Sequence, residues 1–222
     1  MVIMISWIKA ERGNKVKLYF TRHGKTEWNA QRRFQGMHGD SPLLPTSFAQ
    51  IRALGQYLQD VSFAAVYSSP SQRAKQTAQG IVSQWEKPVP IYYDSNLKEM
   101  GYGLLEGKSI DEMQKEYEKT LANMRHHLDL YDPTVFDGET VSAMIERMTR
   151  AITTASNEHE KPVLFVGHGA SLTAAIQFLA GKNVSELCSN GGLKNNSLSI
   201  LETKDKKLPY ELTLWNDVSF LP

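Results

Sequence analysis

Cysteine is nearly absent from this sequence of 222 residues, in which Cys188 is the single example. One thiol cannot form a disulfide within the chain, so the fold does not depend on covalent cross-links. Hydrophobic residues make up 41% of the chain, and a chain of this length can bury a large core without disulfides or a structural metal. We therefore predict one globular domain, 1–222, from a reducing compartment, and we expect a cytoplasmic protein.

Excess charge of one sign and long apolar runs are also lacking. The 25 basic and 24 acidic side chains nearly balance at a formal net charge of +1, so no basic face for nucleic acid is indicated. No apolar run approaches the roughly 20 residues that a membrane helix needs, and the short run at 2–8 lacks the basic start of a signal peptide. We expect neither a nucleic-acid partner nor a membrane, and we interpret residues 1–14 as an N-terminal extension. The sequence gives no indication of an oligomeric state.

Short strand patterns alternate with helical patterns along most of the chain. Apolar runs predict strands, and apolar residues at a spacing of three and four predict helices. We expect Ser69-Pro70 to begin one of these helices and the capping pattern Ser109 to Glu112 to begin another. The predicted strands are 16–21, 63–67, 89–93, 163–166, 198–202 and 210–215, and the predicted helices are 46–59, 70–85, 109–128, 141–152 and one from 171.

This alternation predicts an α/β fold, a three-layer sandwich whose mostly parallel central sheet is flanked by helices. The segment from about 104 to 139 has no strand pattern, and we expect it to be a small helical cap inserted in the domain.

Two predicted strands end in His-Gly, at His23-Gly24 and at His168-Gly169. If both strands belong to one parallel sheet, both imidazoles lie at the sheet edge where α/β proteins bind ligands. The pair could form a metal site, an acid–base pair, or an anion cradle with a nucleophile, and a single strand-end histidine could be purely structural. A metal site is the weakest of these readings, because no carboxylate or thiol lies at ligand spacing from either histidine.

Two arginines favour a phosphate ligand. Arg22 directly precedes the first histidine, and Arg73 lies in the first turn of the helix after Ser69-Pro70. A guanidinium offers a fork of donors that matches phosphate oxygens, and a helix N-terminus adds backbone N–H groups.

Several short blocks in one order resemble the histidine phosphatase superfamily, the group that includes cofactor-dependent phosphoglycerate mutase. The resemblance covers roughly residues 16–202. It rests on Arg22-His23-Gly24, Thr26 to Asn29, Phe34-Gln35-Gly36, Ser68-Ser69-Pro70 through Arg73, Gln76-Thr77-Ala78, Glu99 to Gly107, and Gly167-His168-Gly169.

The resemblance implies a role for each matched position. His23 is expected to attack phosphorus and carry a phosphohistidine, and Glu99 is expected to be the general acid for the leaving group. That role needs a raised pKa, which an apolar setting could supply. No metal or organic cofactor is needed, and the expected partner is a small phosphorylated metabolite. The expected phosphate-binding set is Arg22, Arg73, His168, Asn29, Gln35 and Gly169.

The run around Glu99 favours hydrolysis over isomerisation. Residues 99–107 read Glu-Met-Gly-Tyr-Gly-Leu-Leu-Glu-Gly, which is similar to the phosphatase branch. The mutases usually show Arg-His-Tyr-Gly there, with a longer insertion and an arginine pair that has no counterpart between 100 and 167. We predict a phosphatase acting on a small phosphate monoester. The alternatives are mutase-type phosphoryl transfer and a non-catalytic module that binds a phosphorylated ligand.

Overall fold

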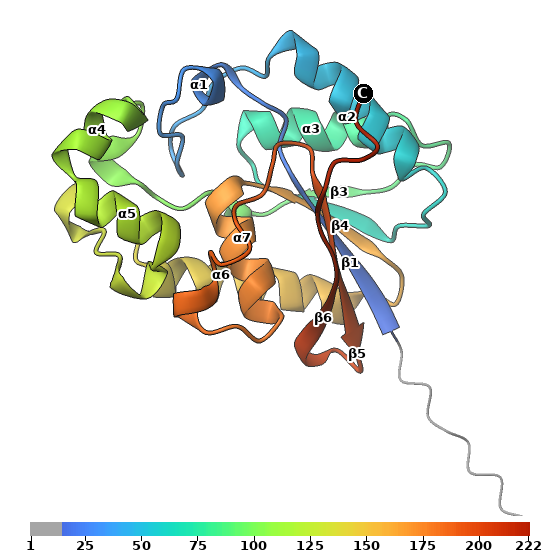
Figure 1. The fold of residues 1–222 in the computed structure, drawn as a ribbon. Coiled ribbons are helices and arrows are strands. Elements are labelled where there is room, and N and C mark those ends of the chain that lie inside the picture. Colours follow the sequence, from blue (N-terminus) through green and yellow to red (C-terminus); the bar gives the residue numbers. More distant parts are fainter. Residues whose placement is uncertain (1–14) are drawn as a thin grey trace, which may run out of the picture.

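One six-stranded mixed sheet forms the centre of the protein (Figure 1). The computed structural model describes residues 15–222, so the predicted extension 1–14 lies outside the described residues. The strands follow the order β3-β2-β4-β1-β5-β6. They are β1 (Lys15–Arg22), β2 (Ala65–Ser68), β3 (Ile91–Tyr93), β4 (Val163–Gly167), β5 (Leu198–Lys204) and β6 (Lys207–Asp217).

The first four strands pair in parallel, and the last two add an antiparallel hairpin beside β1. β4 is buried at every position and lies between β1 and β2, which explains why its sequence is a continuous apolar run.

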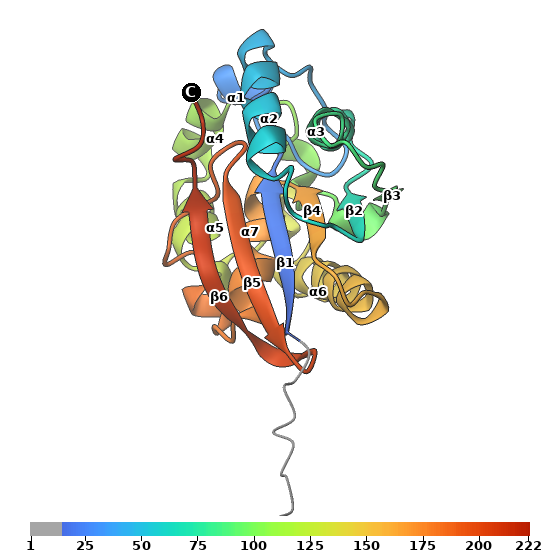
Figure 2. The ribbon, with the colours of Figure 1, turned by 90° about the vertical axis from the view of Figure 1, so that its right-hand side faces the viewer.

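Helices cover both faces of the sheet (Figure 2). Leu18 and Phe20 of β1 pack into a core formed with α6 and α7, whereas Tyr19 points to the opposite core with α2 and α3. This alternation is the period of two expected of a strand. The helices are α1 (Glu27–Ala30), α2 (Pro45–Tyr57), α3 (Gln72–Val82), α4 (Ile110–Glu116), α5 (Glu118–His126), α6 (Val141–Glu158) and α7 (Gly169–Leu179). The architecture is therefore the predicted α/β sandwich.

The segment predicted as a cap contains helices and no strand. Helices α4 and α5 lie to one side of the sheet (Figure 1), and short 3₁₀ turns join them to their neighbours. These turns are Gly103–Leu105, Leu128–Leu130 and Thr134–Phe136; two more are Ser95–Leu97 and Val184–Glu186. No helix among residues 15–222 combines the length and apolar character needed to cross a membrane.

Several predicted helix boundaries differ from those in the structure. Helix α3 begins at Gln72 with Ser71 as its N-cap, because the hydroxyl of Ser69 is 2.7 Å from His168 Nε2 instead of capping the helix. The predicted helix 109–128 is interrupted at Tyr117, whose ψ of 41° leaves the helical region and whose ring packs edge-on against Phe136. Helix α7 starts at Gly169, two residues earlier than predicted.

Candidate active site

The two His-Gly strand ends lie next to each other. Strands β1 and β4 are parallel neighbours, and Arg22 is opposite Gly167 in their register. The rings of His23 and His168 consequently meet edge-on, with centroids 5.2 Å apart. Sequence reasoning placed both histidines at one edge of the sheet, and the strand pairing confirms that placement.

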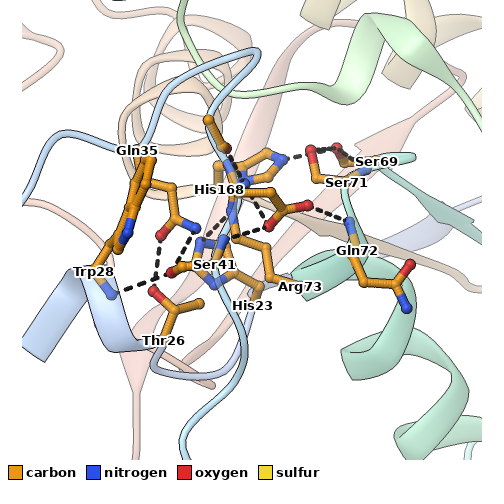
Figure 3. A network of polar contacts seen from close by, with 12 residues as sticks. His23, Thr26, Trp28, Gln35, Ser41, Ser69, Ser71, Gln72, Arg73 and His168 are labelled. Carbon is orange, nitrogen blue, oxygen red and sulfur yellow. Dashed lines mark hydrogen bonds and ion pairs between the residues drawn. The ribbon is translucent and has the colours of Figure 1, made fainter. Parts of the chain in front are cut away.

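The hydrogen bonds of His23 define its tautomer. His23 Nδ1 lies 2.8 Å from the carbonyl oxygen of Gly24, and Arg73 Nε donates to His23 Nε2 over 3.2 Å (Figure 3). Because a guanidinium can only donate, Nε2 must accept, and the ring proton must be on Nδ1. The backbone carbonyl of Gly24 therefore holds His23 with an unprotonated Nε2.

Burial and neighbouring positive charge keep both imidazoles neutral. Burial lowers the pKa of His23 well below its ordinary value of 6.5, and Arg73 and Arg22 lower it further. Burial likewise lowers the pKa of His168 well below 6.5, with Arg73 as the next cause. A neutral imidazole is the form that can act as a nucleophile.

Arg73 is buried against His23 and is held by the loop after α1. Its Nη1 donates to the carbonyl of Gly39 at 2.8 Å and pairs with Asp40 at 3.0 Å, while Nη2 donates to the carbonyl of Gly36 at 3.1 Å. These acceptors aim Nε of Arg73 at His23.

The same loop is ordered by Glu106, a residue to which the sequence assigned no role. Its carboxylate accepts backbone N–H bonds from Met37, His38, Gly39 and Tyr102 at 2.5 to 3.2 Å. The carbonyls that bind Arg73 are therefore fixed by a carboxylate nearly 70 residues away in the sequence.

Arg22 lies close to the start of α7. Its Nη1 donates to the carbonyl of Leu193 at 2.7 Å, and a Cβ at Gly169 would lie only 3.2 Å from its guanidinium carbon. The absence of a side chain at Gly169 thus makes room for Arg22. Among the described residues, Arg22 Nε and His168 Nδ1 are buried atoms without a hydrogen-bond partner.

Glu99 is 6% exposed and binds the N-terminus of α7. Its Oε1 accepts from the backbone of Ser171 at 2.8 Å and of Met100 at 2.9 Å, and its Oε2 accepts from Ala170 at 3.0 Å. Backbone donors at a helix N-terminus stabilise a negative charge. The setting is thus more polar than the apolar neighbours expected from the sequence.

A largely buried ion pair holds the segment that carries Glu99, and sequence reasoning missed it. Arg147 of α6 makes two bonds to Glu139, at 2.6 and 2.7 Å, and donates to the carbonyls of Asn96 and Lys98 at 2.7 Å and of Glu99 at 3.1 Å. The Glu139 carboxylate also accepts from the backbone of Gly101 at 3.2 Å. No local pattern distinguishes these two residues from solvated helix and loop charges, so only their contacts identify them.

Asn29 and Gln35 line the same cavity as His23, and their side-chain oxygens accept hydrogen bonds from within the protein. Asn29 Oδ1 accepts from the backbone of Thr26 at 3.2 Å. The Gln35 amide accepts from the Thr26 hydroxyl at 2.8 Å and donates to Ser41 at 3.1 Å (Figure 3). Gln35 thus supports the loop that also provides the acceptors for Arg73.

A cavity of about 460 Å³ opens in front of His23. Arg22, Asn29, Gln35, Glu99 and Gly169 line it, and Arg73 and His168 contact the His23 ring. The cap segment contributes Ile110, Met124, Arg125, His126 and Leu128 to the wall. In the described part of the chain, no group of three His, Cys, Asp or Glu side chains could hold a metal ion.

Fold and site together define a class of protein: an α/β sheet whose carboxyl edge presents a neutral histidine, with arginines around it, to a cavity. A family model described as the histidine phosphatase superfamily (branch 1) matches residues 18–218, and the chain belongs to that family.

Relatives and solved structures cover most of the chain. The chain is 32% identical over 188 residues to "uncharacterized phosphatase PhoE" of Bacillus subtilis, covering 84% of this chain and 88% of that protein. It is 32% identical over 171 residues to "probable phosphoglycerate mutase GpmB" of Salmonella arizonae, covering 75% of each. The structure of Bacillus stearothermophilus YhfR superposes with a TM-score of 0.84 at 31% identity, covering 92% of this chain and 98% of that one.

Proposed function

We propose that the protein hydrolyses a small phosphate monoester through a phosphohistidine on His23. The observation that supports this proposal is the tautomer of His23: Gly24 holds the ring proton on Nδ1, so Nε2 is unprotonated and its electron pair accepts from Arg73 Nε until a phosphoryl group binds. The unpartnered Arg22 Nε and His168 Nδ1 add to it, since buried polar atoms normally have partners and two such atoms beside His23 fit an anion.

The reaction has two phosphoryl transfers. His23 Nε2 attacks phosphorus, the bond to the ester oxygen breaks, and Arg73 Nε moves from Nε2 to a phosphoryl oxygen. Arg22 and Arg73 stabilise charge on the equatorial oxygens, which is the main demand of such a transition state. Water then attacks the phosphohistidine, and inorganic phosphate leaves with His23 regenerated.

Glu99 exchanges the proton through Oε2. Both acceptor positions of Oε1 are used by Met100 and Ser171, whereas Oε2 accepts only from Ala170 and keeps one position for a proton. Protonated Glu99 gives this proton to the leaving alkoxide and recovers one from the attacking water. Residues 104–139 form the cap over this site within a single domain.

The test is to quench enzyme with acid-free denaturant after mixing with a labelled monoester. We expect acid-labile, base-stable label on wild type and none on His23→Ala, which should also lose turnover of p-nitrophenyl phosphate. Equal turnover by both proteins would refute the mechanism.

Mutase activity is the second candidate, because a probable phosphoglycerate mutase is among the relatives. Hydrolysis should not require 2,3-bisphosphoglycerate. Efficient interconversion of 3- and 2-phosphoglycerate would replace the phosphatase assignment, and tight ligand binding without turnover would indicate a binding module.

A further inference from the structure

The cavity carries more positive charge than one phosphoryl group needs. Three arginines line it, Arg22 beside His23 and Arg33 and Arg125 elsewhere on the wall, and Glu99 is the one lining carboxylate among residues 15–222. The whole chain has a net charge of only +1, so this positive charge is a local feature. A cleft lined by one sign of charge concentrates ligands of the opposite sign.

Three acidic groups of this region, Glu99, Glu106 and Asp111, already have partners. Glu99 and Glu106 accept backbone N–H bonds, as described above. Asp111, at the start of the cap, is bound by Arg32 through Nε at 3.0 Å and Nη2 at 2.7 Å. Among the described residues, no carboxylate lies within ion-pair distance of Arg33 or Arg125.

Arg33 is also held in place. Its Nε donates to Gln31 at 3.1 Å and its Nη1 to the carbonyl of Gly107 at 2.9 Å, and its backbone bridges to Ser109. Arg125 comes from α5 on the cap, so the two guanidinium-bearing residues reach the cavity from separate elements. Apolar side chains line much of the remaining wall, among them Phe34, Met100, Ile110, Met124, Leu128 and Met144.

Resting on the proposed function, we infer that the leaving group of the substrate carries a second anionic group, which Arg33 and Arg125 bind. The phosphoryl group occupies the His23 end of the cavity, an apolar portion contacts the wall, and a carboxylate or second phosphate meets the two arginines. Arg33 and Arg125 are therefore specificity-determining residues for the leaving group.

The experiment compares three aryl phosphates whose leaving groups differ in charge and little in acidity, because a methylene separates the group from the ring. They are 4-(carboxymethyl)phenyl, 4-(phosphonomethyl)phenyl and neutral 4-(carbamoylmethyl)phenyl phosphate. We expect wild type to prefer an anionic ester over the neutral one by about tenfold in kcat/KM, the factor that about 1.4 kcal/mol produces. Which anionic ester is preferred distinguishes a carboxylate from a phosphate.

Arg33→Gln and Arg125→Gln should each reduce the ratio of kcat/KM for the anionic ester to kcat/KM for the neutral one, and the double variant should bring this ratio to about one. Arg52→Gln on α2, which does not line the cavity, is the matched control and should keep the preference. Equal turnover of all three esters by wild type, or a preference that survives in the double variant, would overturn the inference and leave the proposed function intact.

Failure of the proposed function has a different signature, namely no turnover of any ester and no label on His23. In that case, calorimetric measurement of the affinity of wild type and of the arginine variants for the same three esters still tests the second anion site. An affinity that does not depend on the charge of the leaving group would overturn the inference.

Discussion

Replacing Arg147 by methionine should destabilise the protein and slow its chemistry selectively. The side chains of Arg147 and Glu139 are only 11% and 13% exposed, so the substitution leaves a nearly buried carboxylate without its cation. Breaking such a pair costs about 3–5 kcal/mol. The variant should therefore unfold at a clearly lower guanidinium concentration.

The catalytic effect follows from where Arg147 binds. Its guanidinium holds the carbonyls of Asn96, Lys98 and Glu99, and freeing this segment allows the Glu99 carboxylate to shift. A misplacement of about 1 Å can cost about 100-fold in rate. We expect that loss with alkyl phosphates, whose poor leaving groups need a proton, and a much smaller one with p-nitrophenyl phosphate.

Two variants complete the test. Arg147→Lys keeps the positive charge but lacks the planar set of guanidinium N–H donors, and should retain only part of the stability. Arg147→Met combined with Glu139→Leu removes the stranded charge and should be less destabilised than Arg147→Met alone. Arg150 lies one turn further along α6 in an exposed pair with Glu146, so Arg150→Met should change neither the stability nor the rate. Equal slowing of good and poor leaving groups by Arg147→Met would refute the positioning role.

Three further outcomes are expected. Glu99→Gln should slow alkyl phosphates by at least about 100-fold and p-nitrophenyl phosphate far less, and equal slowing would contradict the acid role. Because the pKa values of His23 and His168 are lowered on folding, the unfolded state binds more protons below pH 6.5. Stability should then be complete above pH 6.5 and fall below it by up to about 1.4 kcal/mol per pH unit for each histidine. Denaturant titrations at several pH values should show that the stability of His168→Asn falls with about half the slope of wild type below pH 6.5. An unchanged slope would show that His168 does not contribute to this pH dependence. Glu106→Gln places amide hydrogens against the backbone N–H groups that the carboxylate now accepts from. Phosphohistidine formation should therefore slow by about tenfold in a rapid-quench assay. An unaffected rate would show that the 36–40 loop does not depend on Glu106.

Local sequence was enough for the elements that carry the candidate nucleophile. The apolar run before His23 and the one before His168 each specify a strand, and a parallel sheet brings the ends of its strands to one edge. The pairing of β1 with β4 in a register that opposes Arg22 and Gly167 realises that expectation. The positions of the helix starts were less well predicted, as Ser69 shows, since its hydroxyl binds His168 rather than capping α3.

Tertiary structure alone decided which charged residues support the site. Glu106, Glu139 and Arg147 resemble ordinary surface charges in the sequence, because what distinguishes them is contact with backbone groups far away in the chain. The same holds for Arg33 and Arg125, which share a cavity wall although they belong to different elements. A strand or a helix is specified by its neighbours in sequence, whereas the partner of a buried charge is set by how the whole chain packs.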